Sequence, residues 1–234
     1  MCVFIMVSML TSVCRLAAGE LLQITNTQDL MTDAVKSILA SATTVALACE
    51  VATIEEETVI AVLQVMIPEK ALYIIDIMAP NVELSALSEI LRPLLENADV
   101  LHIVFNASVI CRLLYEQLGL KTLNVYDVVK AHIAVLRQKY EQHPRFRANK
   151  PFQDPTGIIL PKLIQTYAET PYTDAYRHVS ANPGWWLQRP MTDMMRDYAM
   201  KDVLFLRAVQ QNVCTCLSVS LFERSLYYLR FIIY

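Results

Sequence analysis

The sequence predicts an α/β domain, in which a mostly buried, mixed sheet carries helices on both faces and the C-terminal half is helical. Apolar runs of strand length, rich in β-branched residues, are concentrated in the first half, whereas apolar residues at helical spacing dominate the second. Of the 234 residues, 55% are hydrophobic and 18% are charged. This composition allows a sizeable core and is far from that of disordered chains.

The first half is expected to consist of four strands and one helix. An Asn or Thr at position 26 or 27 suits the N-terminal cap of that helix, and three consecutive Glu residues suit the tip of a hairpin. In chain order, the expected elements are a strand over Glu20–Thr25, a helix over Gln28–Leu39, a strand over Thr43–Cys49, a turn at Glu55–Glu57, and strands over Thr58–Met66 and Ala71–Met78 around a turn at Pro68–Lys70.

The second half is expected to be mainly helical. Leucines recur at spacings of three and four in its first helix, and a glycine stands just past the end of the next one, where a helix commonly terminates. The expected elements are a helix over Asn81–Asn97, a strand over Val100–Phe105, helices over Ser108–Gln117 and Val125–Gln142, a loop over residues 143–161, and helices from Pro161 onward with a break at Ala181–Gly184.

Both ends of the chain are unusually apolar. Residues 1–13 carry no charge, are shorter than the roughly 20 residues of a membrane span, and are followed rather than preceded by the first basic residue, Arg15. A targeting segment and a buried strand or helix both remain open for them. The division expected is an apolar segment over residues 1–20, the main domain over 21–210 and a helical extension over 211–234. The two ends suggest a homodimer or partner interface, with completion of the fold within one chain as the alternative.

Net charge is −3, so contact with nucleic acid would need a local basic patch. One segment concentrates cations and interleaves Tyr140 and Phe146, the mixture that single-strand binding uses. An ordinary solvated loop is the alternative. The candidate RNA-binding residues are Arg137, Lys139, Arg145, Arg147 and Lys150, with His143 among them.

The six cysteines favour a reducing compartment, because most of them lie in apolar runs where a buried free thiol is common. The Cys214-Thr215-Cys216 pair is too close for an ordinary disulfide, and no His/Cys cluster of zinc-ligand spacing accompanies it.

Three segments together carry a resemblance to a known family. They are Val45-Ala46-Leu47-Ala48-Cys49-Glu50 with Val62-Leu63-Gln64-Val65, then Phe105-Asn106-Ala107-Ser108-Val109-Ile110 with Asn124-Val125-Tyr126-Asp127 downstream, and finally Trp186-Leu187-Gln188-Arg189-Pro190-Met191 with Tyr198-Ala199-Met200-Lys201-Asp202. Their order and spacing resemble the RNase D-like branch of the DEDDy 3′–5′ exonucleases. Within that branch they look similar to Egalitarian and to the exonuclease 3′–5′ domain-containing protein of the PIWI-interacting RNA pathway.

The resemblance implies a ribonuclease-H-like three-layer fold and a site at which four carboxylates hold two Mg²⁺ or Mn²⁺ ions about 4 Å apart. Here Glu50 and Asp202 keep their carboxylates and Tyr198 is also kept, whereas Ala48 and Ile110 stand at the other two acidic positions. The missing acid at Ala48 is the one expected to bridge both ions. The site is therefore interpreted as degenerate, with no catalytic residue and the metal pair lost.

Alternatives stay open at several positions. A shift of register in the second motif would bring Asp99 or Glu116 nearer to the site, although neither is well placed. Glu50, Tyr198 and Asp202 could persist for structural hydrogen bonds alone. Packing is favoured over base stacking for Trp186 and Arg189-Pro190, a place in the fold over ligation for His102, and a place in the core for Cys49.

The resulting hypothesis is a pseudo-exonuclease that binds single-stranded RNA and acts as a homodimeric adaptor in a small-RNA ribonucleoprotein complex. It implies protein partners of that pathway, no membrane, and a cytoplasmic location that includes perinuclear granules. A protein–protein scaffold without RNA binding and a residual metal-dependent exoribonuclease are the competing hypotheses.

Overall fold

The computed structural model describes residues 20–142, 152–168 and 184–217. Its centre is a six-stranded mixed sheet in the order β1-β4-β3-β2-β5-β6. Strands β2, β3 and β4 form an antiparallel meander, while β1 is parallel to β4, β5 to β2, and β6 to β5. The strands are β1 Glu20–Ile24, β2 Thr44–Ile54, β3 Glu57–Ile67, β4 Ala71–Asp76, β5 Leu101–Val104 and β6 Val125–Asp127.

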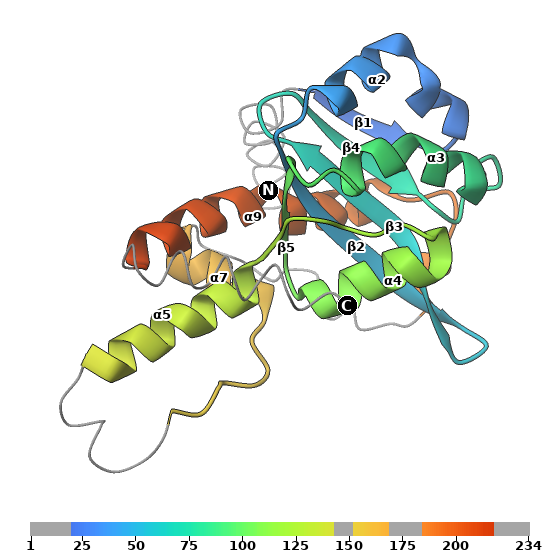
Figure 1. Cartoon of the computed structure of the whole chain (residues 1–234). Coiled ribbons are helices and arrows are strands. Elements are labelled where there is room, and N and C mark those ends of the chain that lie inside the picture. The colour runs from blue at the N-terminus through green and yellow to red at the C-terminus, as the bar shows by residue number, and fades with distance from the viewer. Residues whose placement is uncertain (1–19, 143–151, 169–183, 218–234) are drawn as a thin grey trace, which may run out of the picture.

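Helices cover both faces of this sheet, as Figure 1 shows, so the predicted three-layer α/β class is confirmed. The described helices are η1 Thr27–Met31, α2 Asp33–Ala40, α3 Leu84–Leu95, α4 Ala107–Leu118, α5 Val128–Gln142, α7 Leu160–Tyr167, η2 Trp185–Leu187 and α9 Asp193–Cys216. None of them, within the described ranges, is long and apolar enough to cross a membrane.

Two apolar cores flank the sheet. The core between the sheet and α5, α7, η2 and α9, here called the α9-side core, includes Ala46, Val62, Trp186 and Val203. The core between the sheet and α2, α3 and α4, here called the α3-side core, includes Val45, Leu47, Leu91 and Leu114. Residues on β2 alternate between the two cores because successive side chains of a strand point to opposite faces.

Two predicted helices differ from the structure. The expected helix over Gln28–Leu39 is divided at Thr32, whose extended backbone ends η1 and whose Oγ1 accepts a hydrogen bond from Val35 N at 3.3 Å to cap α2. The expected helix over Val125–Gln142 begins only at Val128. Its first three residues form β6 instead, because they pair with β5, and this tertiary pairing outweighs the helical periodicity.

The last described helix spans the position at which the helical extension is expected to begin. Helix α9 is continuous across the expected boundary at residues 210 and 211, and its N-terminus is capped by Thr192. The apolar residues 1–13 and most of the expected C-terminal extension, residues 218–234, lie outside the described residues.

His102 belongs to the fold, as expected. It is fully buried on β5, with Nδ1 2.6 Å from the Leu123 carbonyl oxygen and Nε2 3.1 Å from the Leu94 carbonyl oxygen. Burial lowers the pKa of this imidazole, and the two carbonyl contacts partly oppose that effect. The ring therefore ties β5 to α3 and to the segment before β6.

The β2–β3 hairpin turns on two glutamates with left-handed backbone, Glu55 with φ 49° and Glu56 with φ 71°, flanked by the paired residues Ile54 and Glu57. A two-residue turn of this kind favours Asn-Gly, because the left-handed region costs other residues about 1–2 kcal/mol. We expect the double substitution Glu55→Asn, Glu56→Gly to raise the free energy of unfolding by about 1–2 kcal/mol. Chemical denaturation would measure this.

The control for that substitution is the Glu55→Gln, Glu56→Gln variant, which removes the same two charges and leaves the backbone demand in place. A gain of equal size in both variants would assign the effect to charge repulsion at the hairpin tip and contradict the conformational explanation.

Candidate functional site

Strand β2 brings two of the candidate positions to one face of the sheet. Ala48 packs against the α9-side core, and Glu50 follows two residues later on the same face. Cys49 between them packs against the α3-side core, as predicted, and burial raises the pKa of its thiol to about 12, with Glu50 and Cys111 as smaller causes. The thiol is therefore in its neutral form at physiological pH.

The neighbour of Ala48 on β3 is Gln64, which is fully buried. Neither its amide nitrogen nor its amide oxygen has a hydrogen-bond partner among the described residues. A buried amide without a hydrogen-bond partner costs roughly 1–3 kcal/mol of stability, and this one lies beside Ala48. The signal for it in the sequence is a glutamine within an otherwise apolar strand.

A β-bulge lies immediately beside Glu50. Glu50 pairs with Val62, but Val51 pairs with Ile60, which leaves Ala61 of β3 without a partner on β2. The Ala61 carbonyl accepts hydrogen bonds from Ile77 N at 3.1 Å and from Arg189 Nη2 at 3.2 Å. On the α4 side, the Gln117 amide secures the same stretch by accepting from Ile60 N and donating to the Thr58 carbonyl. These hydrogen bonds tie the strand beside Glu50 to Arg189 and Ile77 and, through Gln117, to α4.

Helix α9 supplies the third motif. Tyr198 and Asp202 are four residues apart and so lie on one side of the helix, which packs against β2 and β3. The Tyr198 ring stands edge-on to Trp185, with centroids 5.5 Å apart, and lies 5.9 Å from Trp186. Both tryptophans are buried. The expectation that Trp186 packs rather than stacks bases agrees with this burial.

Arg189 locks the tryptophan segment onto the sheet. Its guanidinium binds the buried Asp76 carboxylate at the end of β4, with Nε 2.7 Å and Nη2 2.5 Å from Oδ1, and donates through Nη1 to the Trp186 and Gln188 carbonyls. Arg189 therefore positions the aromatic cluster that holds Tyr198, in keeping with the structural role expected for it.

Glu50 on β2 and Asp202 on α9 interact electrostatically. Burial raises the pKa of the Glu50 carboxyl well above its usual range, and the negative charge of Asp202 raises it further. Two carboxylates that repel one another in this way disfavour simultaneous ionisation unless a cation lies between them. Across residues 20–142, 152–168 and 184–217, His, Cys, Asp and Glu form no group of three or more that could hold a metal ion.

The second motif lies at the start of α4 and does not join this pair by any described contact. Ile110 is 3% exposed and packs in the α3-side core, on the opposite face from Ala48 and Tyr198. Asn106, just before the helix, adopts left-handed backbone with φ 61°. The structure thus places Glu50, Tyr198, Asp202 and Ala48 on the α9 side of the sheet and Ile110 among apolar residues on the other.

Asp127 at the end of β6 has a structural function. Its buried carboxylate accepts hydrogen bonds from Asn106 N, Ala107 N and Val129 N at 3.1, 2.9 and 2.9 Å. These N–H groups belong to the first turns of α4 and α5, which otherwise lack partners and which favour a negative charge. The aspartate fixes where both helices begin.

The candidate RNA-binding residues are only partly described. Arg137 and Lys139 are exposed on the distal half of α5, and Arg145, Arg147 and Lys150 lie outside the described residues. Arg137 is already engaged, because its Nη2 lies 2.7 Å from Asp154 Oδ1 and its guanidinium carbon lies 5.4 Å from the centroid of the Phe152 ring. The contacts of Arg137 with Phe152 and Asp154 are not predicted by the sequence.

Comparisons with known proteins agree with this architecture. Residues 22–215 match the family described as 3′–5′ exonuclease. Among curated proteins, none matches the sequence.

Three solved structures illustrate the similarity of fold. The Trypanosoma brucei RNase D complex with RNA U12 superposes with a TM-score of 0.69 at 15% identity, covering 95% of this chain and 74% of that one. The Aedes aegypti Nibbler EXO domain gives 0.64 at 16% identity, covering 90% and 94%. The catalytic core of RRP6 from Trypanosoma brucei gives 0.67 at 17% identity, covering 90% of this chain.

The chain spans half the length of that RRP6 structure. At these identities the superpositions establish the fold, while the sequence match over residues 22–215 establishes the family. The chain belongs to the 3′–5′ exonuclease domain family.

Proposed function

We propose that this chain is an exonuclease-like domain that binds single-stranded RNA without cleaving it. The observation that carries the proposal is the carboxyl pair of Glu50 and Asp202, which stands beside the methyl group of Ala48. Two-metal hydrolysis needs enough oxygen ligands for two divalent ions with near-octahedral coordination. Two carboxylates and a methyl group do not fit such a pair, and we derive no catalytic step through it.

The decisive experiment compares the wild-type chain with Ala48→Asp, which adds a third carboxylate on the face of Glu50. A ligand that binds only the folded state raises the melting temperature by mass action. At about 10 mM Mn²⁺, a concentration chosen to favour occupancy of any site present, we expect the melting temperature of the wild-type chain to stay unchanged. We expect the melting temperature of Ala48→Asp to rise. Labelled single-stranded RNA should stay intact with the wild-type chain.

The residual-nuclease alternative predicts the opposite result. Manganese-dependent trimming of the RNA by the wild-type chain, abolished in Asp202→Ala, would overturn the proposal of inactivity. The Asp202→Ala variant also controls for a contaminating nuclease, because trimming that persists in it cannot come from this site.

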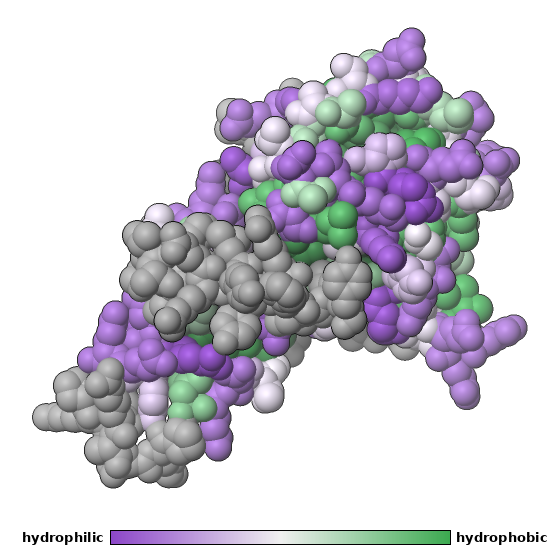
Figure 2. All heavy atoms as spheres, in the orientation of Figure 1, coloured by the Kyte–Doolittle hydropathy of each residue, from purple (hydrophilic) through white to green (hydrophobic). Residues whose placement is uncertain are grey.

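RNA binding is supported by the basic residues of α5 and by the family. The Trypanosoma brucei RNase D is solved in complex with RNA, and this chain shares its fold. Arg137 and Lys139 lie on α5, and Figure 2 shows that the visible surface over this helix is mostly hydrophilic. Filter binding to single-stranded RNA tests this. We expect affinity to fall as salt rises, and absence of binding at low salt would contradict RNA binding.

We further propose that the chain acts as a homodimeric adaptor in a small-RNA ribonucleoprotein complex, together with protein components of that pathway and in cytoplasmic, perinuclear granules. This finer role rests on the motif resemblance to Egalitarian and to the PIWI-pathway protein and on the apolar sequence of residues 1–13 and 229–234. Light scattering at micromolar concentration tests the dimer, and a monomer would argue for a partner of another kind.

A further inference from the structure

Helix α5 runs away from the sheet, and the chain returns beside it, as Figure 1 shows. We call α5 together with residues 152–154 the arm. On the arm, Arg137 and Tyr140 are three residues apart and therefore lie on the same side of the helix. Phe152 from the returning chain meets both, with its ring centroid 5.4 Å from the Arg137 guanidinium carbon and 5.5 Å from the Tyr140 centroid at an interplanar angle of 57°.

The carboxylate of Asp154 also contacts this group, through Arg137. Asp154 Oδ1 accepts from Arg137 Nη2 at 2.7 Å, and both side chains are 52% exposed. An exposed ion pair of this kind shifts an equilibrium by no more than about fivefold. The pair is therefore strong enough to orient the guanidinium over Phe152 and weak enough to be exchanged for another anion.

We propose that Arg137, Tyr140 and Phe152 form a binding site for one nucleotide of single-stranded RNA. The phosphate takes the place of the Asp154 carboxylate on Arg137, and the base stacks on the accessible part of the two rings. This inference rests on the proposed RNA binding and goes beyond it, because it assigns a site on the arm, away from Glu50 and Asp202, and a competing group within the chain.

The chemistry of the group favours a nucleotide. A guanidinium binds phosphate through two parallel N–H donors, and a phosphate oxygen suits the position of Asp154 Oδ1. Half-buried aromatic rings stack with any base because each base has a π face, so the site would bind RNA with little sequence preference. Asp154 meanwhile neutralises the charge of Arg137 in the free protein.

The test measures the fluorescence anisotropy of a labelled oligouridylate over a series of salt concentrations. The oligouridylate has about 12 nucleotides, which lies within the range of known single-strand site sizes. We expect Asp154→Asn to bind about two- to fivefold more tightly than the wild-type chain. Its plot of log affinity against log salt should keep the wild-type slope, because Arg137 contacts one phosphate in both complexes.

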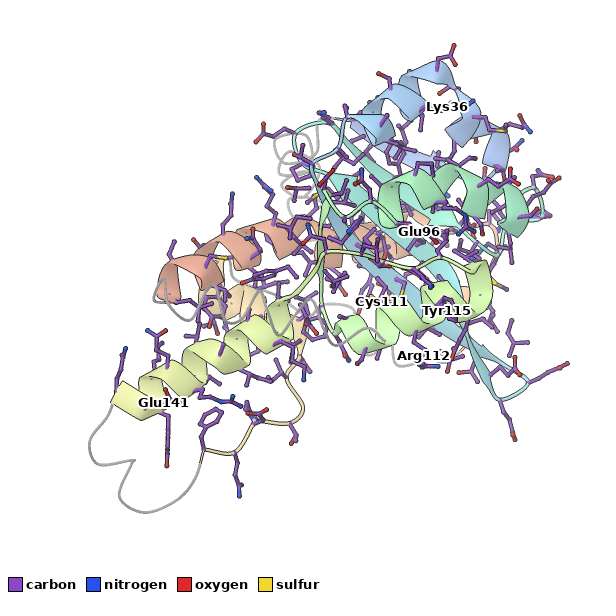
Figure 3. The ribbon with its side chains drawn as sticks, in the orientation of Figure 1. Lys36, Glu96, Cys111, Arg112, Tyr115 and Glu141 are labelled. Carbon is purple, nitrogen blue, oxygen red and sulfur yellow. The ribbon has the colours of Figure 1, made fainter. Side chains whose placement is uncertain are left out.

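The matched control is Glu141→Gln. Glu141 is the penultimate residue of the same helix, about one turn beyond Arg137, and is labelled in Figure 3. No described ion pair includes it, so this variant removes the same charge from the same part of the arm and leaves the Arg137–Asp154 ion pair intact. Equal gains in Asp154→Asn and Glu141→Gln would mean a general field effect and would overturn the competing role of Asp154.

A third variant, Phe152→Leu, removes the ring and keeps apolar volume. We expect it to bind oligouridylate about 5- to 150-fold more weakly, while its affinity for an abasic oligonucleotide of equal length stays unchanged. Melting temperatures confirm that each variant is folded. If the wild-type chain and Asp154→Asn both fail to bind RNA, the proposed function falls with this site. If RNA binds and Phe152→Leu binds it as the wild type does, only this site is overturned.

Discussion

The substitution Arg189→Met is expected to lower the free energy of unfolding by about 3–5 kcal/mol, because it leaves the buried charge of Asp76 without its partner. Asp76 is 2% exposed and the Arg189 side chain 18%. Methionine keeps much of the apolar volume but none of the donors that reach Asp76, Ala61, Trp186 and Gln188. For a chain of this length the melting temperature should fall by roughly 2–4 °C for each kcal/mol.

The matched control is Arg112→Met on the outer face of α4, labelled in Figure 3. Arg112 pairs with Glu116 at 2.9 Å, but these side chains are 55% and 51% exposed, so its loss should cost less than about 1 kcal/mol. The double variant Arg189→Met, Asp76→Asn should recover part of the loss, since it removes the stranded charge as well. A loss of less than about 1 kcal/mol in Arg189→Met would show that the carboxylate finds another partner.

Arg189→Met should also loosen the aromatic cluster of Trp185, Trp186 and Tyr198, because the guanidinium ties the Trp186 carbonyl to the bulge of β3 and to the end of β4. Near-ultraviolet circular dichroism reports on this packing independently of global stability. An unchanged spectrum together with a reduced melting temperature would separate the structural ion pair from the positioning of Tyr198.

The sequence was sufficient to predict those features that depend on local periodicity. The alternation along β2 already separated Ala48 and Glu50 from Cys49, and the leucine spacing located α3. The short strand β6 was missed because three residues carry no periodicity of their own, and only pairing with β5 makes Val125–Asp127 a strand.

The site was predictable in part for the same reason. Motifs placed Glu50, Tyr198 and Asp202 in the correct elements, but the pairing of Arg189 with Asp76 joins residues 113 positions apart, a separation that periodicity does not reach. Likewise, Ile110 was placed by motif register beside the metal position, whereas the structure packs it in the α3-side core. Which core a helical residue enters depends on how the helix sits on the sheet.

Glu50→Gln is expected to stabilise the protein at neutral and alkaline pH. Because the folded-state pKa of Glu50 is raised above its unfolded value, the folded state binds the proton more tightly. Stability from this group is therefore greatest below the unfolded pKa, and it is lost as pH rises toward the folded pKa. Glutamine keeps the shape and cannot ionise, so the variant should not lose this stability.

The measurement is the melting temperature of both chains between roughly pH 4 and pH 8. This interval begins near the usual pKa of a glutamate carboxyl and ends well above it. We expect the two curves to meet at the acid end and to separate as pH rises, until the variant is more stable by roughly 1–3 kcal/mol, a typical size for a single substitution. Glu89→Gln, an exposed carboxyl on α3, is the control and should follow the wild-type curve throughout.

The sign of this result separates the two main hypotheses for the site. Without a bound cation, Glu50 is a half-buried carboxyl that Asp202 repels, and its neutral replacement relieves that repulsion. With a divalent cation held between them, both groups are ligands in their ionised form, and Glu50→Gln removes one ligand and destabilises the protein in Mn²⁺. A variant less stable than the wild type at pH 8, by a margin that grows with Mn²⁺, would establish a surviving cation site and reopen the question of catalysis.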